Sequence, residues 1–393
     1  MKKLIALFFA IGGIAFVSCN NTEQSATTVQ PDSTSKNEDW TLGTFTKADS
    51  VNPVLQAGNA MFIDPILKRE IKWENKDVFN PAIVVRDGKI HMLYRAEDTI
   101  GKYAGTSRIG LAVSSDGLHF VKQSTPVLFP AEDDQKQYEW EGGCEDPRVV
   151  EDDKGIYFMT YTSYDGKTAR LLVASSTDLQ TWKKHGPAFA KAYNGKYKDL
   201  WSKSGSIVST YEKDGKIVAR KINGKYWMYW GDVNIWAATS DDLINWTPLL
   251  YEDGEKATIE LRHYAKEIPE MRIVFGPRPK KFDSDLVEPG PPAMITPNGI
   301  LLIYNSRNVP AIGDSALVEG TYAASQILLD SANPAKVLKR MESYFIKPDK
   351  PYEISGQVNQ VCFLEGLARF NNNWYLYYGT ADSKIAVAVA PQK

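Results

Sequence analysis

The chain has 393 residues, of which 43% are hydrophobic and 24% are charged, and its formal net charge is −2. This length suits one large all-β domain as well as two average domains, and the absence of a basic run argues against nucleic acid as a partner. The four histidines show no metal-ligand spacing and no nucleotide-binding glycine motif occurs, so we expect no metal and no cofactor.

The N-terminus reads as an export signal. Two lysines precede an apolar run at 4–17, which is too short to span a bilayer, so residues 1–18 are predicted to be a signal peptide. The run leads into Cys19 in a pattern that resembles a bacterial lipobox, although Phe16 departs from it. We expect cleavage before Cys19, a lipid on this cysteine as the sole membrane contact, and an extracytoplasmic location at the periplasmic or outer-membrane face. The alternative is an ordinary cleaved signal with an incidental cysteine.

A polar linker and one long domain follow. Residues 19–39 are rich in Ser and Thr and nearly free of apolar side chains, which predicts a disordered tether. Residues 40–393 are predicted to be a single catalytic domain. Its two cysteines, Cys144 and Cys362, are interpreted as small buried residues, and no disulfide is predicted between them.

The domain contains a repeated strand pattern. Segments 110–120, 172–182 and 236–246 each place an apolar strand before a Ser or Thr, an Asp and a closing aromatic residue. Five β-rich runs also stand behind Gly- or Asn-containing turns, at 90–94, 156–161, 226–230, 300–304 and 374–378. This repetition predicts an all-β fold, a five-bladed β-propeller, with 251–285 and 310–350 as irregular insertions. Polar residues at the start of each inner strand are then expected to converge on one site.

The densest polar cluster lies directly before the second of these runs. Residues 140–148 include three carboxylates, two glycines and Arg148. Neighbouring carboxylates can have separated pKa values, which general acid and base chemistry requires. The alternative is a solvated acidic turn in which Arg148 only neutralises Asp146.

Several motifs together resemble glycoside hydrolase family 130, over about 80–389. They are Asn80-Pro81-Ala82, Leu93-Tyr94-Arg95, Gly143-Cys144-Glu145-Asp146-Pro147-Arg148, Tyr161-Thr162-Ser163-Tyr164-Asp165-Gly166 and Tyr378-Gly379-Thr380-Ala381-Asp382. The resemblance implies a five-bladed propeller that acts on β-mannosides, as a phosphorylase or as a β-1,2-mannosidase. An oligosaccharide is therefore the expected partner.

The resemblance also assigns roles to residues. Asp146 matches the general acid, which in the family protonates the departing oxygen through a sugar hydroxyl. Asn80, Arg95 and Asp382 match positions that hold the mannose, and Arg148 is expected to bind substrate beside them. For Arg95 the alternative is a salt bridge with Glu97 or Asp98.

The nucleophile separates the two reactions. Arg170 and Lys203 match basic positions of the phosphorylases, but 229–232 lacks the His-Arg pair that those enzymes carry there. Glu288 stands where phosphorylases have a small residue, and a carboxylate can activate water. Asp232 or Glu260 is expected to assist it. The alternative is that Glu288 is an exposed loop acid.

These observations favour an inverting glycoside hydrolase that cleaves β-mannosidic linkages, with β-1,2 linkages as the expected target. Phosphorolysis is useful where phosphate is plentiful and the sugar phosphate is retained, so an exported protein fits hydrolysis better. Two alternatives stay open. One is a β-mannoside phosphorylase that releases mannose 1-phosphate, and the other is a non-catalytic glycan-binding lipoprotein.

Overall fold

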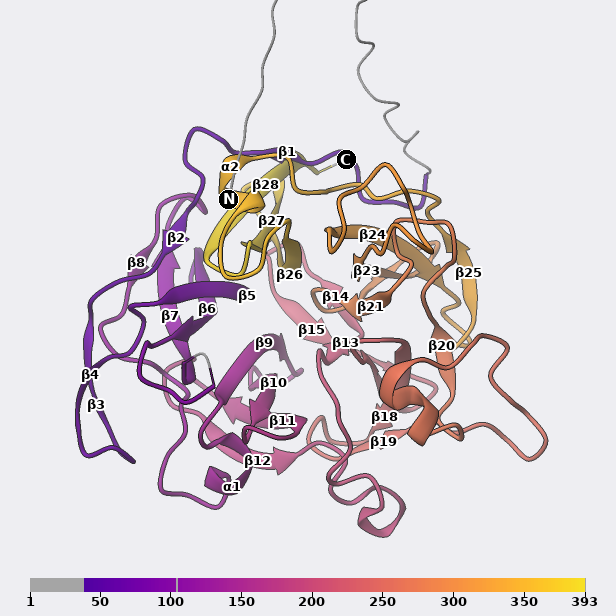
Figure 1. The fold of residues 1–393 in the computed structure, drawn as a ribbon, viewed down its shortest axis with the longest axis horizontal. Helices are drawn as coiled ribbons and strands as arrows, with labels where there is room; N and C mark the ends of the chain where they lie inside the picture. The colour runs from indigo at the N-terminus through magenta and orange to yellow at the C-terminus, as the bar shows by residue number, and fades with distance from the viewer. Residues whose placement is uncertain (1–38, 104, 393) are drawn as a thin grey trace, which may run out of the picture. The chain divides into compact units, whose positions relative to one another are not determined.

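Short antiparallel strands make up nearly all of the regular structure in the computed structural model, which describes residues 39–103 and 105–392 (Figure 1). Its helices are short: α1 (Lys136–Glu139), α2 (Pro351–Ile354) and two 3₁₀ turns, Ala192–Gly195 and His263–Glu267. No helix in the described ranges has the length and apolar character needed to cross a bilayer. The predicted signal peptide, the lipid on Cys19 and nearly all of the predicted tether lie outside the described residues.

The strands form successive antiparallel groups. The first group contains β5 (Asp77–Arg86), β6 (Lys89–Glu97), β7 (Ser107–Ser114) and β8 (Val121–Lys122). The second contains β9 (Gly143–Glu151), β10 (Tyr157–Tyr164), β11 (Ala169–Ser176) and β12 (Lys183–Pro187). The third contains β13 (Ser206–Ile207), β17 (Lys225–Trp230), β18 (Ile235–Ser240) and β19 (Trp246–Pro248).

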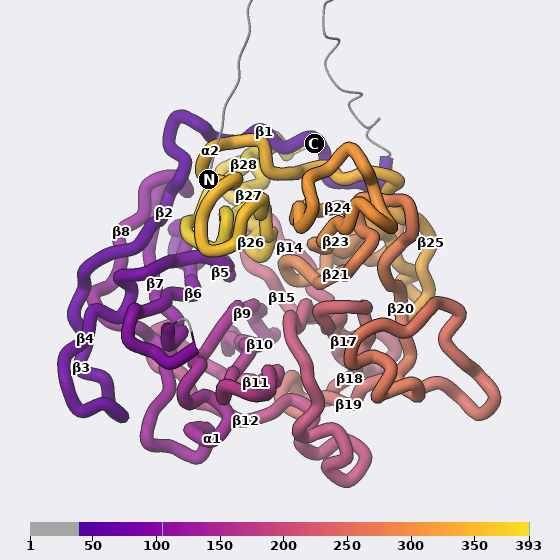
Figure 2. The backbone as a smooth tube through the Cα atoms, viewed as in Figure 1, coloured from indigo at the N-terminus to yellow at the C-terminus, as the bar shows by residue number. Residues whose placement is uncertain are grey.

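Two further groups complete the order. In one, β21 (Leu286–Pro289) and β22 (Met294–Thr296) both pair with β23 (Gly299–Arg307), followed by β24 (Tyr322–Leu329) and β25 (Val337–Arg340). The other contains β26 (Cys362–Phe370), β27 (Asn373–Thr380), β28 (Lys384–Pro391) and the N-terminal strand β1 (Thr46–Lys47). Figure 2 shows this indigo N-terminal segment beside the yellow C-terminal strands. The two ends of the described chain therefore meet in one group.

The remaining strands are short and join or flank these groups. They are β2 (Leu55–Gln56), β3 (Met61–Asp64), β4 (Arg69–Lys72), β14 (Ser209–Tyr211), β15 (Ile217–Ala219), β16 (Lys221–Ile222) and β20 (Ile273–Phe275). Parallel contacts connect neighbouring groups, as between Ser107 of β7 and Gly143 of β9.

A buried polar set recurs in four of the groups. A tyrosine in the second strand donates its hydroxyl to a buried carboxylate, which also pairs with a cation from the outermost strand of that group. The sets are Tyr94–Glu74–Lys122, Tyr161–Glu139–Lys184, Tyr304–Asp283–Arg340 and Tyr378–Glu353–Lys47. In the third group Trp230 stands at the end of the second strand instead. The recurrence indicates that the groups are repeats of one unit.

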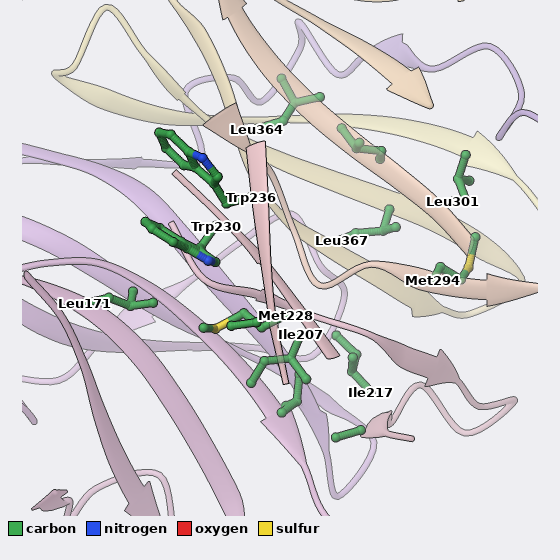
Figure 3. Packing of buried hydrophobic residues seen from close by; sticks show 14 of the residues in the cluster. Leu171, Ile207, Ile217, Met228, Trp230, Trp236, Met294, Leu301, Leu364 and Leu367 are labelled. Carbon is green, nitrogen blue, oxygen red and sulfur yellow. The ribbon is translucent and has the colours of Figure 1, made fainter. Parts of the chain in front are cut away.

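Apolar side chains fill the space between neighbouring groups (Figure 3). The largest cluster joins Leu171 of β11 to Ile207 and Met228 of the third group, where Trp230 and Trp236 stack with ring centres 5.0 Å apart. Strands that are covered on both faces need no polar alternation. That is why their sequences are continuous apolar runs.

The predicted hairpins are confirmed, since the five runs form the main part of β6, β10, β17, β23 and β27, with Ile156 directly before β10. Cys144 and Cys362 are buried, as predicted, and both are free. The interpretation of 251–285 and 310–350 as irregular insertions is wrong in part, because 251–285 contains β20 and 310–350 contains β24 and β25. The sequence of β24 has two alanines after Tyr322 and no strict polar alternation, because both of its faces are buried.

Candidate active site

Bulges redirect polar side chains at the start of two inner strands. In β5 the pairing skips Asn80, and in β9 Asp146 and Pro147 together face the single residue Tyr161. Asn80 and Asp146 have φ angles of 50° and 47°. A bulge with left-handed backbone turns its side chain away from the alternation of the strand. Such strained backbone is concentrated at functional sites.

The redirected side chains meet in one pocket. Its polar lining comes from Asn80, Arg95, Asp146, Lys203, Glu288 and Asp382, and its apolar lining from Phe79, Tyr322, Val358, Val361 and Phe363. Six of the nine sequence-predicted site residues therefore lie together. Ser204, next to Lys203, and Asp382 also have positive φ angles, of 58° and 49°.

Asp146 lies among positive and hydrogen-bonding groups. Asn80 Nδ2 donates to Asp146 Oδ1 at 2.9 Å, Arg95 Nη1 lies 3.1 Å from the same oxygen, and Lys203 Nζ lies 3.7 Å from Oδ2. Burial raises the pKa of Asp146, but Arg95 and Lys203 outweigh it and hold this pKa well below its usual range. Asp146 is therefore ionised among these neighbours.

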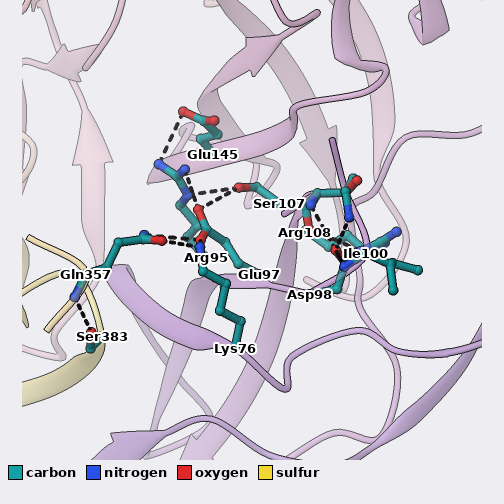
Figure 4. Close-up of polar contacts among 12 residues, drawn as sticks. Lys76, Arg95, Glu97, Asp98, Ile100, Ser107, Arg108, Glu145, Gln357 and Ser383 are labelled. Atoms are coloured by element: carbon teal, nitrogen blue, oxygen red, sulfur yellow. Dashed lines mark hydrogen bonds and ion pairs between the residues drawn. The ribbon is translucent and has the colours of Figure 1, made fainter. Parts of the chain in front are cut away.

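Arg95 connects Asp146 to two further acids, Glu97 and Glu145, and Figure 4 shows its contacts with these two acids. Its guanidinium lies 2.8 Å from Glu97 and 3.2 Å from Glu145, in addition to its contact with Asp146. The salt bridge with Glu97 that was considered as an alternative is present, and it accompanies the contact with Asp146. The cation is therefore fixed in place before any sugar binds.

Glu288 is a buried member of the pocket. It lies on β21 and is 6% exposed, so its interpretation as an exposed loop acid is wrong. Ser204 Oγ donates a hydrogen bond to Glu288 Oε1. Burial raises the pKa of Glu288 to about 7, with Lys203 acting against this shift and Asp232 adding to it.

Asp382 follows β27 and lines the same pocket as Arg95 and Asp146. Burial raises the pKa of this carboxyl to about 7, and the charge of Arg95 opposes the shift. A carboxyl group with a pKa of about 7 is partly protonated at neutral pH. It can accept a hydrogen bond from a sugar hydroxyl when ionised and donate one when protonated.

Asp232 lies beside the pocket and not in its lining. Trp201 Nε1 donates to Asp232 Oδ2 at 3.0 Å, and the Tyr264 hydroxyl donates to Oδ1 at 2.6 Å. Its charge acts on both Lys203 and Glu288. Glu260, by contrast, is exposed and forms an ion pair with Arg262, at 3.7 Å. Of the two proposed assistants, Asp232 is the one that influences Glu288.

Arg170 is engaged elsewhere. It lies 2.7 Å from Asp165 and 3.0 Å from Asp199, and it is not among the residues that line the pocket. Its position in the register matches that of Arg108 in the first group, which pairs with Asp98 in the same way. Arg148 also lies outside the lining and is 1% exposed.

Sequence reasoning missed two polar residues at this centre, Ser204 and the fully buried Glu365. A signal for them exists in the sequence. The start of each inner segment carries a polar residue directly followed by Pro or Gly, as in Asn80-Pro81, Asp146-Pro147, Ser204-Gly205, Glu288-Pro289 and Glu365-Gly366. Within the described ranges, no cluster of His, Cys, Asp and Glu suited to a metal ion is found.

Acid and base chemistry needs two carboxyl groups with different proton affinities, and this pocket holds them. Asp146 is kept ionised by its cationic neighbours, whereas Glu288 titrates near neutrality. The remaining lining offers an amide, two cations and aromatic rings, which suits a hydroxyl-rich ligand with an apolar face.

Comparison with known proteins identifies the family. A family model described as beta-1,4-mannooligosaccharide phosphorylase matches residues 59–393. A 1,2-beta-oligomannan phosphorylase of Thermoanaerobacter sp. (strain X514) is 31% identical, over 84% of this chain and 95% of the relative.

Solved structures agree with this assignment. A putative glycosidase from Bacteroides thetaiotaomicron VPI-5482 is 47% identical with a TM-score of 0.84, over 90% of this chain and 99% of the other. Another solved structure is described in these words: "The GH130 family of mannoside phosphorylases contains glycoside hydrolases that target beta-1,2 mannosidic linkages in Candida mannan". It is 43% identical with a TM-score of 0.85, over 92% of this chain and 99% of the other. The chain belongs to glycoside hydrolase family 130.

Proposed function

We propose that this protein is an inverting glycoside hydrolase that uses water to cleave β-mannosidic linkages, with β-1,2-linked mannooligosaccharides as substrate. The observation that carries the proposal is Glu288, a buried carboxyl in the same pocket as Asp146 with a pKa of about 7. A carboxyl with this pKa is well matched to activating water at neutral pH. The similarity to structures that include β-1,2-mannan hydrolases supports the choice of linkage.

In the proposed reaction Glu288 accepts a proton from water, whose oxygen attacks the anomeric carbon opposite the departing oxygen. A sugar hydroxyl protonates the departing oxygen and is itself reprotonated by Asp146. The bond to the departing sugar breaks, and the new bond to water gives mannose of inverted configuration.

The acid role requires Asp146 to take up a proton when substrate binds. In the empty pocket the pKa of Asp146 is low because Arg95 and Lys203 outweigh its burial. A bound sugar excludes water and offers hydroxyl oxygens to both cations, and both effects favour the protonated carboxyl.

Phosphorolysis is the second candidate, because curated relatives are phosphorylases and Lys203 is present in the pocket. The charge balance disfavours it. The pocket lining carries three carboxyl groups, Asp146, Glu288 and Asp382, and two cations, Arg95 and Lys203. Phosphate would add further negative charge beside Glu288. Arg170, the other basic residue considered for phosphate, pairs with Asp165 and Asp199.

We also propose that the strand groups are the blades of a five-bladed propeller and that the protein is an exported lipoprotein. The recurring tyrosine–carboxylate–cation sets support the first proposal. The sequence pattern at 1–19 supports the second.

Proton NMR of β-1,2-mannobiose in phosphate-free buffer tests the reaction. We expect free mannose to form, with an early excess of the α anomer over its equilibrium share, because the non-reducing unit is released inverted while the reducing unit already holds both anomers. No turnover without phosphate would contradict the proposal, and an early excess of the β anomer would contradict inversion.

A further inference from the structure

Arg148 belongs to the acidic motif of the sequence, yet none of its hydrogen bonds is made to a side chain that lines the pocket. Its Nε donates to the carbonyl oxygen of Gly290 at 2.8 Å and its Nη2 to that of Pro289 at 2.7 Å. Its Nη1 donates to the carbonyl oxygen of Asp146 at 3.3 Å and lies 2.9 Å from Glu365 Oε1. One guanidinium thus contacts the backbone of Asp146 and the two residues that follow Glu288.

This arrangement joins segments that are far apart in sequence. Arg148 and Gly290 are separated by 142 positions, and they come from β9 and from the turn that follows β21. A guanidinium is planar and presents its N–H groups in fixed directions, so it can hold two backbones at a set distance and angle. Lysine has the same charge but lacks this fork.

Glu365 completes the arrangement. Its side chain has no exposure, and it lies where the pairing of β26 with β27 skips one residue. A buried guanidinium is strongly unfavourable unless polar groups face it, and Glu365 provides one of them, 2.9 Å from Arg148 Nη1. Glu365 does not line the pocket.

We infer that the Arg148–Glu365 pair is a positioning device that sets the separation of Asp146 and Glu288, an inference that rests on the roles given to these two carboxyls in the proposed function. Neither residue lines the pocket. Reacting groups that move by about 1 Å lose on the order of 100-fold in rate. The pair therefore governs kcat more than substrate binding.

Arg148→Lys tests this inference, with Arg108→Lys as its matched control. Arg108 is equally buried and pairs with Asp64 and Asp98 at 2.7 Å each, away from the pocket lining. We expect Arg148→Lys to lower kcat about 100-fold with KM changed less than about threefold. Arg108→Lys should lower Tm while kcat stays within about threefold of wild type. Retained kcat in Arg148→Lys, or an equal loss in both variants, would overturn the inference.

Two variants of Glu365 test the same inference if Arg148→Lys does not fold. Glu365→Gln keeps an oxygen acceptor for Arg148, whereas Glu365→Leu removes it. We expect kcat to fall at least tenfold further in the Leu variant, and equal kcat in both would overturn the inference.

Failure of this inference can be told apart from failure of the proposed function. Rates are measured with and without phosphate, so the positioning role is tested whichever nucleophile the wild-type enzyme uses. A crystal structure of Arg148→Lys gives a readout independent of turnover. We expect Pro289 and Gly290 to be displaced relative to Asp146. An unchanged separation of these residues would contradict the positioning role of Arg148.

Discussion

Asp146 and Glu288 are both carboxyls of one pocket, but their surroundings give them opposite charge preferences. Arg95 and Lys203 stabilise the ionised form of Asp146, while burial and the charge of Asp232 stabilise the neutral form of Glu288. If Glu288 activates water, it must be ionised in the substrate complex, where Asp146 has taken up its proton. The value of kcat should therefore rise with pH through about 7 and then level off.

Asp232→Asn tests the assignment of this acid limb to Glu288. Removing the negative charge lowers the pKa of Glu288, so the limb should move to lower pH by roughly one pH unit. The pH profile of kcat measures this. Asp382 also has a pKa of about 7, but Asp232 is not among the main charges that act on Asp382. A limb that belongs to Asp382 should therefore stay in place, which makes Asp382 the internal control. An unmoved limb, or one moved to higher pH, would show that another group titrates.

The residues of the site were only partly predictable from sequence. Asp146, Asn80, Arg95 and Asp382 were found because specific motifs carry them, and Glu288 because an acid stands where a small residue is usual. Ser204 and Glu365 were missed because a single Ser-Gly or Glu-Gly step resembles any turn. Arg148 and Arg170 were expected at the substrate because spacing reveals charge but not the direction in which a side chain points.

At the scale of elements, the repeated tyrosine–carboxylate–cation sets tie the outermost strand of each group to its interior. Lys47 provides the cation in the group that joins the two ends of the described chain, 2.7 Å from the unexposed Glu353. Lys47→Met leaves this carboxylate without its cation, which should lower the free energy of unfolding by about 3 kcal/mol.

Chemical denaturation measures this change, and Lys196→Met is the matched control. Lys196 pairs with Glu270 at the same kind of distance, 2.8 Å, but at the surface. We expect no measurable change in this control. Equal effects of the two substitutions would contradict a structural role for the buried set.

Hairpins were the best-predicted elements, because Asn-Gly and Asp-Gly turns between β-rich runs specify local pairing. The strands β24 and β25 were not recognised, since β24 is covered on both faces and lacks a strict polar alternation. Bulges at Asn80 and Asp146 could not be read from sequence either, because the extra residue is defined only by the partner strand.

At the scale of the whole molecule, the chain from Trp40 to Lys47 ties the N-terminal side of the domain to distant strands. Trp40 is buried in the main apolar cluster, the backbone of Leu42 hydrogen-bonds to the Gln326 side chain at 2.9 Å, and β1 pairs with β28. Removing residues 1–47 should therefore lower the free energy of unfolding by at least about 4 kcal/mol.

Removing only residues 1–38 is the control for this truncation. The sequence predicts a signal peptide and a tether there, so Tm and kcat should stay at the values of the longer protein. Thermal unfolding and activity of the two truncated proteins measure the difference. Equal stability of both would show that β1 does not support the fold.

The proposed reaction uses water, and not phosphate, as the nucleophile. Product analysis tests this directly, after incubation of the wild-type enzyme with β-1,2-mannobiose, in parallel without phosphate and with phosphate in excess. We expect mannose as the sole product in both reactions, at the same rate. Formation of mannose 1-phosphate, together with a rate that rises with phosphate concentration, would contradict it.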